Sequence, residues 1–206
     1  MMINKTDVTV IILAGGKSER MNGADKGLLR INDKYIIKKL YSLSKRFSEQ
    51  VYINANRNID QYTKMGFTVW QDVMQGYQGP LAGMYSSLKN INTEYLLTLP
   101  CDGPLVNEKY FERMLAESIN NNIELRSAHN GERIQPVYSL ISRELLPSLK
   151  DFLDTGQRKI DKWFELCNLE LVDFSDDKSI FININREEDL IEYKDMINKI
   201  LENNGQ

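Results

Sequence analysis

A glycine-rich segment near the start of the chain has the composition of a phosphate-binding loop. Residues 13–21 read LAGGKSERM, in which Gly15 and Gly16 let the backbone approach an anion and offer free amides to its oxygens. Lys17 and Arg20 would balance the anion's charge. A plain glycine turn between a strand and a helix would give the same two glycines. The segment is neither a G-x-G-x-x-G fingerprint nor a P-loop.

A lysine follows this segment in the tripeptide Asp25-Lys26-Gly27. Lys26 stands where a chain leaving the loop can turn back on a triphosphate, and Gly27 leaves room for that approach. Taken alone, however, Asp25 and Lys26 are more often a solvated ion pair than a site. The tripeptide therefore indicates a phosphate site only in combination with the other segments.

An aspartate between two prolines marks a candidate metal site. Pro100-Cys101-Asp102-Gly103-Pro104 follows the apolar run of residues 95–99, and its prolines and glycine fix the backbone around one carboxylate. Mg²⁺ is often held by one or two carboxylates together with substrate phosphates and water, so a single fixed aspartate is adequate chemistry. Asp102 is the leading metal ligand. A turn-forming aspartate would have the same neighbours.

A third segment, residues 78–84 with the sequence QGPLAGM, combines a rigid Gly79-Pro80 turn with small residues that open a helix. Such a helix start can pack close to a planar ligand, although a turn before an ordinary helix fits equally well. Together, the three segments indicate a ligand site more strongly than each does alone, because ligands of doubly wound sheets bind beyond the carboxyl ends of the strands.

Covalent catalysis is not indicated by the sequence. His129 is the only histidine and falls in the polar stretch of residues 129–133, which we interpret as a surface loop or a substrate contact. Cys101 has no positioned base and is interpreted as a packed thiol. Cys167 lies far from it in sequence, so the two cysteines form neither a disulfide framework nor a metal set.

Composition bounds the function further. The 206 residues, 42% hydrophobic and 27% charged, are typical of one ordinary globular domain. A net charge of −3 gives no global attraction to nucleic acid or to anionic membranes. No stretch approaches the roughly 20 apolar residues that span a bilayer. We expect a cytoplasmic protein that binds neither nucleic acid nor membrane.

The order of the elements predicts an α/β fold. Short β-branched runs at residues 8–13, 51–55, 68–71 and 95–99 alternate with segments of helical spacing, which predicts a single-domain, doubly wound, Rossmann-like and mostly parallel sheet with helices on both faces. Further expected helices and strands are helices at 107–120 and 143–152, strand-like runs at 123–127, 135–140, 169–174 and 180–184, and a helix opened by the acidic residues 187–189.

With these segments assembled, the sequence resembles the molybdenum cofactor guanylyltransferase family over nearly its whole length. The resemblance rests on ordered matches at residues 13–16, 20–21, 25–29, 54–57, 79–84, 100–102, 129–133, 135–136 and 181–185. It implies a fold like that of the nucleotide-diphospho-sugar transferases. It also implies one domain, residues 1–206, with a GTP-binding half at about 1–105 and a molybdopterin-side half at about 106–206.

The resemblance also implies roles for individual residues. Arg20, Lys26 and Asp102 would be catalytic, with Asp102 also binding Mg²⁺, and Asn183 with Asn185, near the end of a strand, would face molybdopterin. The loop 129–133 would close that side. Whether Asn54 and Asp72 meet the base or the ribose stays open. The GTP contacts that the resemblance implies are Leu13, Ala14, Gly15, Gly16, Lys26, Asn54, Asp72 and Asp102, with Arg20, Gly23, Gly79, Pro80 and Gly83 lining the site.

One position departs from the family pattern, since Asn22-Gly23 stands where members often carry two glycines. Asparagine tolerates left-handed backbone angles better than most residues, so the turn can be retained.

The implied reaction transfers GMP from GTP to molybdopterin and releases pyrophosphate, through positioning and electrostatics rather than a protein nucleophile. The resemblance places GTP and molybdopterin as substrates of a monomer, with molybdopterin-delivery proteins and molybdoenzyme chaperones as partners.

Rival interpretations are a cytidylyltransferase, which usually has Leu-Ala-Ala-Gly in the first loop, a sugar-phosphate nucleotidyltransferase, which typically has Pro-Lys at residues 25–26, and a non-catalytic adaptor that holds GTP or molybdopterin.

Overall fold

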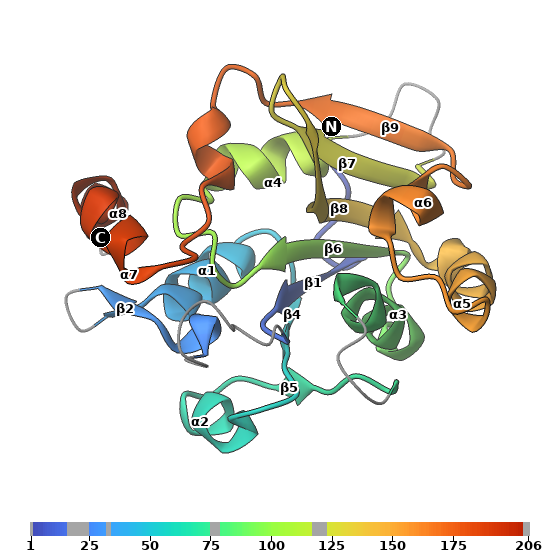
Figure 1. Ribbon diagram of the computed structural model, residues 1–206, viewed down its shortest axis with the longest axis horizontal. Helices are drawn as coiled ribbons and strands as arrows, with labels where there is room; N and C mark the ends of the chain where they lie inside the picture. The colour runs from blue at the N-terminus through green and yellow to red at the C-terminus, as the bar shows by residue number, and fades with distance from the viewer. Residues whose placement is uncertain (1, 16–24, 32–33, 75–78, 117–122, 204–206) are drawn as a thin grey trace.

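A seven-stranded sheet forms the centre of the protein (Figure 1). The computed structural model describes residues 2–15, 25–31, 34–74, 79–116 and 123–203. The strand order is β5-β4-β1-β6-β8-β7-β9; β8 is antiparallel to β6 and β7, and the remaining neighbours are parallel. The strands of this sheet are β1 (Val8–Leu13), β4 (Gln50–Asn54), β5 (Val69–Trp70), β6 (Tyr95–Pro100), β7 (Leu125–His129), β8 (Ile134–Ser142) and β9 (Leu169–Asp173).

Helices cover both faces of the sheet, as the sequence predicted. α1 and α4 lie on one face, and α3, α5 and α6 on the other (Figure 1). The doubly wound, mostly parallel α/β prediction is therefore confirmed. The helices are α1 (Ile36–Ser44), α2 (Ile59–Lys64), α3 (Pro80–Asn90), α4 (Glu108–Met114), α5 (Leu146–Asp154), α6 (Ile160–Phe164), α7 (Glu187–Glu192) and α8 (Lys194–Asn203), with 3₁₀ turns η2 (Lys26–Leu28), η3 (Arg143–Leu145) and η4 (Lys178–Phe181).

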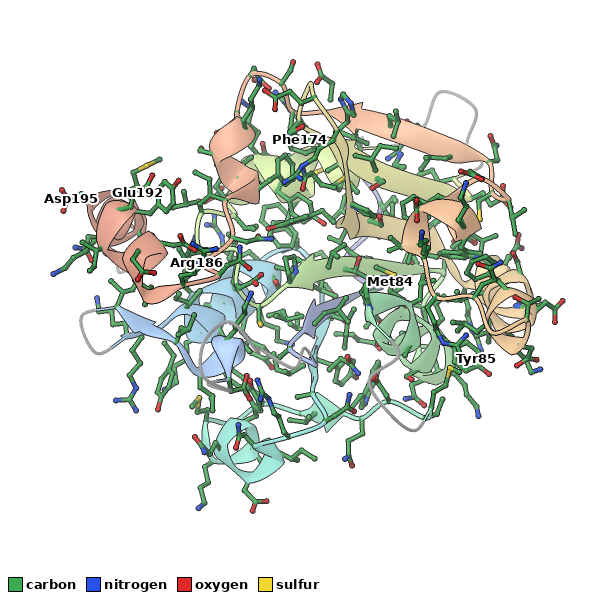
Figure 2. All side chains as sticks on the ribbon, in the orientation of Figure 1. Met84, Tyr85, Phe174, Arg186, Glu192 and Asp195 are labelled. Atoms are coloured by element: carbon green, nitrogen blue, oxygen red, sulfur yellow. The ribbon has the colours of Figure 1, made fainter. Side chains whose placement is uncertain are left out.

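The two faces of β1 explain its β-branched sequence. Val8, Val10 and Ile12 pack into the core beneath α1 and α4, while Ile11 packs into the core beneath α3 and α5. All four side chains are fully buried. A strand covered on both faces needs apolar residues at consecutive positions, because successive side chains point to opposite sides. Helix α3 packs on its side of the sheet through Met84, which is fully buried, while the next residue, Tyr85, is only partly buried against the same core (Figure 2).

The predicted strand at residues 180–184 is wrong. Residues 178–181 form the 3₁₀ turn η4, and the backbone N–H of Ile184 donates to the carbonyl of Asp102 instead of a strand ladder. The apolar residues of this stretch did indicate burial, since the structure buries Ile180, Phe181 and Ile184. Their spacing does not alternate as one face of a strand requires.

Other boundaries also differ from the sequence prediction. The helix expected at 107–120 is described only as α4, Glu108–Met114, and residues 117–122 lie outside the described part. The helix expected at 143–152 begins with the 3₁₀ turn η3 and continues to Asp154. Helices α2 and α6 and the small hairpin of β2 (Arg30–Ile31) and β3 (Lys34–Tyr35) were not predicted. Within the described residues, no helix is both long and apolar enough to cross a membrane.

Helix α1 contributes a buried lysine to the interior. Lys39 is 7% exposed, and its Nζ donates to the backbone carbonyls of Pro104, at 2.7 Å, and Val106, at 2.6 Å. Burial lowers the pKa of Lys39 from 10.5 to about 7, because the charged form loses its hydration. A neutral amine still carries two N–H donors for the two carbonyls.

This lowered pKa predicts how stability changes with pH. Between about pH 7 and 10.5 the unfolded chain binds more protons at residue 39 than the folded chain, so the free energy of unfolding rises with pH in that window. Relative to Lys39→Met, the wild-type free energy of unfolding should rise by up to about 1.4 kcal/mol per pH unit from pH 7 to 9. Urea unfolding of both proteins across this range measures the difference. A difference that stays constant with pH would contradict the prediction.

Candidate nucleotide site

The ends of β1, β4 and β6 meet at one edge of the sheet. The backbone N–H of Ala14 donates to the carbonyl of Asn54 at 2.8 Å, and that of Cys101 donates to the carbonyl of Leu13 at 3.0 Å. All three strands run parallel and β1 lies between the other two, so the segments that follow them share the carboxyl edge. This is the edge at which ligands bind in open α/β sheets.

Lys26 joins three distant parts of the chain at this edge. Its Nζ donates to Asp102 Oδ2 at 2.8 Å and to Asn185 Oδ1 at 2.6 Å. The side chains of Lys26 and Asp102 are only 20% and 12% exposed, so the ion pair is partly shielded from water. We call Lys26, Asp102 and Asn185 the lysine group. It presents a fixed positive charge, a carboxylate and an amide within one cluster.

Asp25 is not the solvated partner of Lys26 that the sequence suggested. Its carboxylate is buried and accepts hydrogen bonds from the backbone N–H of Gly27 at 3.0 Å, Tyr62 Oη at 2.8 Å and Asn58 Nδ2 at 3.0 Å. Burial, followed by the Asp25 charge, raises the pKa of the Tyr62 hydroxyl. Asp25 therefore fixes the η2 turn while Lys26 points toward Asp102.

A second polar group lies where β4 and β5 end. Asn54 Nδ2 donates to Asp72 Oδ1 at 2.9 Å, and Asn56 Nδ2 donates to Asp72 Oδ2 at 2.7 Å. The backbone N–H of Asp72 returns a bond to Asn56 Oδ1 at 2.8 Å. Both carboxylate oxygens of Asp72 are thus held by amides, which fixes the geometry of Asn54 beside β1. Asn56 belongs to a stretch matched by the resemblance but was not singled out as a site residue.

Two glycines let backbone segments approach Asn54. A Cβ on Gly83 would lie 2.5 Å from Asn54 Oδ1 and 2.9 Å from Leu13 Cδ2, and one on Gly15 would lie 3.3 Å from Asn56 Nδ2. Gly79 precedes α3 with φ of 76°, which favours glycine, and Pro80 begins the helix. The helix start predicted from the sequence is confirmed, and it packs against the Asn54–Asp72 group.

The segment that carries Asn183 and Asn185 is anchored although it is not a strand. Tyr138 Oη donates to Asn183 Oδ1 at 3.2 Å, and Ile184 N donates to the carbonyl of Asp102 at 2.9 Å. Asp189, at the start of α7, accepts from the backbone N–H of Asn185 at 2.7 Å. These bonds bring Asn185 to Lys26, whereas Asn183 faces Tyr138.

His129 is the last residue of β7 and not part of a free loop, which corrects the sequence interpretation. The backbone N–H of Phe174 donates to its carbonyl, and its Nδ1 accepts from the backbone N–H of Gly131 at 3.1 Å. The turn beyond it is closed by Asn130 and by a surface ion pair between Glu132 and Lys178. The contacts described for this turn do not include the lysine group.

Cys101 has the properties of a packed thiol. It is buried, and burial, together with the neighbouring Asp102 charge, raises its pKa well above the usual range. A thiol held protonated is a poor nucleophile. The sequence interpretation of Cys101 agrees with this environment.

The donor set limits which metal ion fits the site. Among the described residues no group of three or more histidine, cysteine, aspartate or glutamate side chains could hold a metal ion. The Asp102 carboxylate, shared with Lys26, suits a hard cation that completes its shell with phosphate and water, as Mg²⁺ does. Zinc would need more protein ligands. Gly16, Lys17, Arg20, Asn22 and Gly23 lie outside the described residues.

Tyr62 and Asn58 are site-supporting residues that sequence reasoning missed. They contact Asp25 across 37 and 33 positions of sequence, from α2 and the residue that precedes it. A six-residue helix gives too little periodicity to be found, and a tyrosine in it carries no signal of a buried carboxylate partner.

The mostly parallel sheet, with the lysine group and the Asn54–Asp72 group at its carboxyl edge, fits a nucleotide-binding α/β domain, and the matching family model assigns it to the nucleotidyltransferases. The chain belongs to the family of MobA-like NTP transferase domains, whose model matches residues 10–171.

Two curated relatives in this family carry the same name, molybdenum cofactor guanylyltransferase. A molybdenum cofactor guanylyltransferase from Shewanella pealeana is 42% identical over 181 residues, covering 88% of this chain and 90% of the relative. One from Vibrio parahaemolyticus is 36% identical over 192 residues, covering 93% and 97%. The crystal structure of molybdopterin-guanine dinucleotide biosynthesis protein A from Archaeoglobus fulgidus has the same fold, with a TM-score of 0.77 and 21% identity over 93% of this chain and 99% of that one.

The Asp25 contacts yield a prediction about Gly27. A Cβ at residue 27 would lie 2.2 Å from Tyr62 Oη, so Gly27→Ala must displace the tyrosine and should lower the free energy of unfolding by roughly 1–3 kcal/mol. Tyr62→Phe removes the obstructing hydroxyl. The double variant should therefore lose less stability than the sum of the two single variants.

Urea unfolding of the four proteins in this cycle gives the coupling energy. Strictly additive losses would show that residue 27 does not press on the Tyr62 hydroxyl.

Proposed function

We propose that this protein transfers GMP from GTP to molybdopterin, with Mg²⁺, and releases pyrophosphate. The observation that carries the proposal is the lysine group: Lys26, Asp102 and Asn185 form one cluster at the carboxyl edge of the sheet in a chain of this family. The names of the curated relatives support guanine as the base and molybdopterin as the acceptor.

GTP would bind along the ends of β1, β4 and β6. In this proposal the amides of Gly15, Gly16 and Gly23 would bond phosphate oxygens, and Arg20 would offset the phosphate charge. The Asn54–Asp72 group lies on the β4–β5 side of this edge, away from β6, and α3, which begins at Pro80 after Gly79, approaches it through Gly83. This side would suit the nucleoside. In this arrangement Leu13, Ala14 and Gly83 lie against the nucleotide, and residues 1–105 supply most of its contacts.

Molybdopterin would bind on the other side of Lys26. Asn185 contacts Lys26 directly, and Asn183 precedes Asn185 by two residues. Both belong to the part of the chain beyond residue 105. Amide side chains can donate to a phosphate or accept from a pterin N–H. We propose that this half, residues 106–206, presents the acceptor phosphate to GTP, and that a cytoplasmic monomer receives it from delivery proteins and passes the product to molybdoenzyme chaperones.

The chemical step needs no covalent intermediate with the protein. A terminal phosphate oxygen of molybdopterin forms a bond to the α-phosphorus of GTP while the bond to the β-phosphate oxygen breaks and pyrophosphate leaves. Lys26 offsets charge on the phosphates, assisted by Arg20 and the loop amides. Asp102 would hold Mg²⁺, which supplies further charge neutralisation when bound.

The choice of nucleotide separates this proposal from its rivals. With molybdopterin and Mg²⁺, we expect pyrophosphate release from GTP to exceed release from CTP or ATP by at least about tenfold, a difference of roughly 1.4 kcal/mol in transition-state binding. Release is measured for each nucleotide at equal concentration, with and without molybdopterin.

Preference for CTP would instead support a cytidylyltransferase. GTP binding without any release, from the intact protein with Mg²⁺ and molybdopterin, would support an adaptor and end the proposal.

The proposed metal role predicts the effect of Asp102→Asn, which keeps the side-chain shape but removes the charge. Pyrophosphate release should fall by roughly two orders of magnitude, as is typical when one electrostatic contact to the transition state is lost. Higher Mg²⁺ should recover part of the loss. The matched control is Asp154→Asn, because Asp154 is 59% exposed in a surface pair with Lys150.

Release within a few-fold of wild type for Asp102→Asn would mean that Asp102 is not the principal metal ligand.

A further inference from the structure

The backbone that follows Asp102 is held by a lysine from a different element. Lys39, on α1, donates from Nζ to the carbonyls of Pro104 and Val106, at 2.7 Å and 2.6 Å. These acceptors lie two and four residues beyond Asp102. The donor is 7% exposed, and Ile36, Ile37 and Leu40 of the same helix are buried in the core.

This contact is unusual for a buried lysine. Buried lysines generally pair with a carboxylate, because an amine without a partner is costly to desolvate. Lys39 instead satisfies two backbone carbonyls in an irregular segment between β6 and α4, where no sheet or helix ladder is available. A methionine could fill the same volume, so the amine's specific contribution is to fix this backbone.

The segment has further anchors on both sides of Gly103. The N–H of Cys101 is bonded to Leu13, and the carbonyl of Asp102 accepts from Ile184. Gly103 leaves room for the hydroxyl of Tyr138, which would lie 2.4 Å from an added Cβ. Downstream, Leu105 and Val106 are buried and Asn107 Nδ2 donates to Asp177 Oδ2 at 3.3 Å. Lys39 adds the two hydrogen bonds that hold the carbonyls of this stretch. The Asp102 carboxylate is therefore carried by a backbone segment fixed at both of its ends.

We propose that Lys39 is a positioning residue for the Asp102 carboxylate. By holding residues 104 and 106 it keeps Asp102 where it meets Lys26 and, in the proposed function on which this inference rests, Mg²⁺. Displacements of about 1 Å in a positioned group are enough to impair catalysis, so the loss of two hydrogen bonds in this segment should reach the metal without unfolding the protein.

Lys39→Met tests the proposal, with Lys38→Met as the matched control. Lys38 is the preceding residue of α1 and is exposed, so it undergoes the same substitution without the buried contacts. Two measurements are needed. Hydrogen exchange reports the backbone of residues 101–107 in the ligand-free protein, and titration of GTP binding with and without Mg²⁺ reports the metal site independently of turnover.

For Lys39→Met we expect faster exchange confined to residues 101–107 and about tenfold weaker Mg²⁺-dependent GTP binding, with GTP binding in the absence of Mg²⁺ unchanged. In steady state, kcat should fall more than KM for GTP rises, and raised Mg²⁺ should restore part of it. Lys38→Met should match wild type. Unchanged exchange at residues 101–107, or a uniform rise across the protein with unchanged Mg²⁺ dependence, would overturn the proposal.

Two further arms keep the result decisive. If Lys39→Met does not fold, Lys39→Gln replaces it, because glutamine retains two N–H donors on one nitrogen. This variant should give intermediate exchange and intermediate Mg²⁺ dependence. Wild-type behaviour of Lys39→Gln, combined with an unfolded Lys39→Met, would make the role purely structural. If wild-type protein itself shows no Mg²⁺-dependent GTP binding, the proposed function fails. The exchange of residues 101–107 then decides alone whether Lys39 holds the segment.

Discussion

The ion pair between Lys26 and Asp102 is the constraint on which the site depends. It joins the turn that follows the first loop to the end of β6, and the amide of Asn185 adds a segment from near the carboxyl terminus. A long lysine side chain in water loses conformational freedom when it is held in one place, and exposed pairs gain little from it. Here both side chains are mostly buried, so the attraction between the charges is less screened.

Hydrogen bonds to several of the charged groups in this region offset the cost of burying them. Asp25 takes three donors, Asp72 has an amide on each oxygen, and Lys39 meets two carbonyls. Each of these groups lies next to a segment that the sheet cannot hold by its own ladder. Buried polar networks are favourable only when their members are satisfied, and a satisfied network also limits the alternative positions of its loops. The described segments that carry Asp25, Asp72 and Pro104 are thereby restrained by side-chain hydrogen bonds.

The sequence predicted the sheet edge better than it predicted the supporting contacts. Asp102 was singled out because it follows a predicted strand, and Lys26 because a chain that leaves the first loop can turn back toward that edge. The fold brings the two together across 76 positions of sequence. Asn185 was found through the family resemblance, although its segment was wrongly predicted as a strand. The partners of Asp25 and Lys39 could not be found, because they depend on where α1 and α2 pack against loops that are distant in sequence. Local pattern reports which face of an element is buried but not what it meets there.

In the proposed function, the same ion pair would let one site serve both phosphate and metal. Lys26 and Asp102 offset each other's charge in this ion pair. In the proposed reaction the phosphates bring negative charge to Lys26, and the carboxylate becomes available to Mg²⁺ in the same exchange. Binding of nucleotide and metal would then be coupled, because each offsets the charge that the other uncovers. Such an exchange requires that neither partner drift away when the pair opens, which is the role that the geometry gives to Asp25 on the lysine side and to Lys39 on the aspartate side.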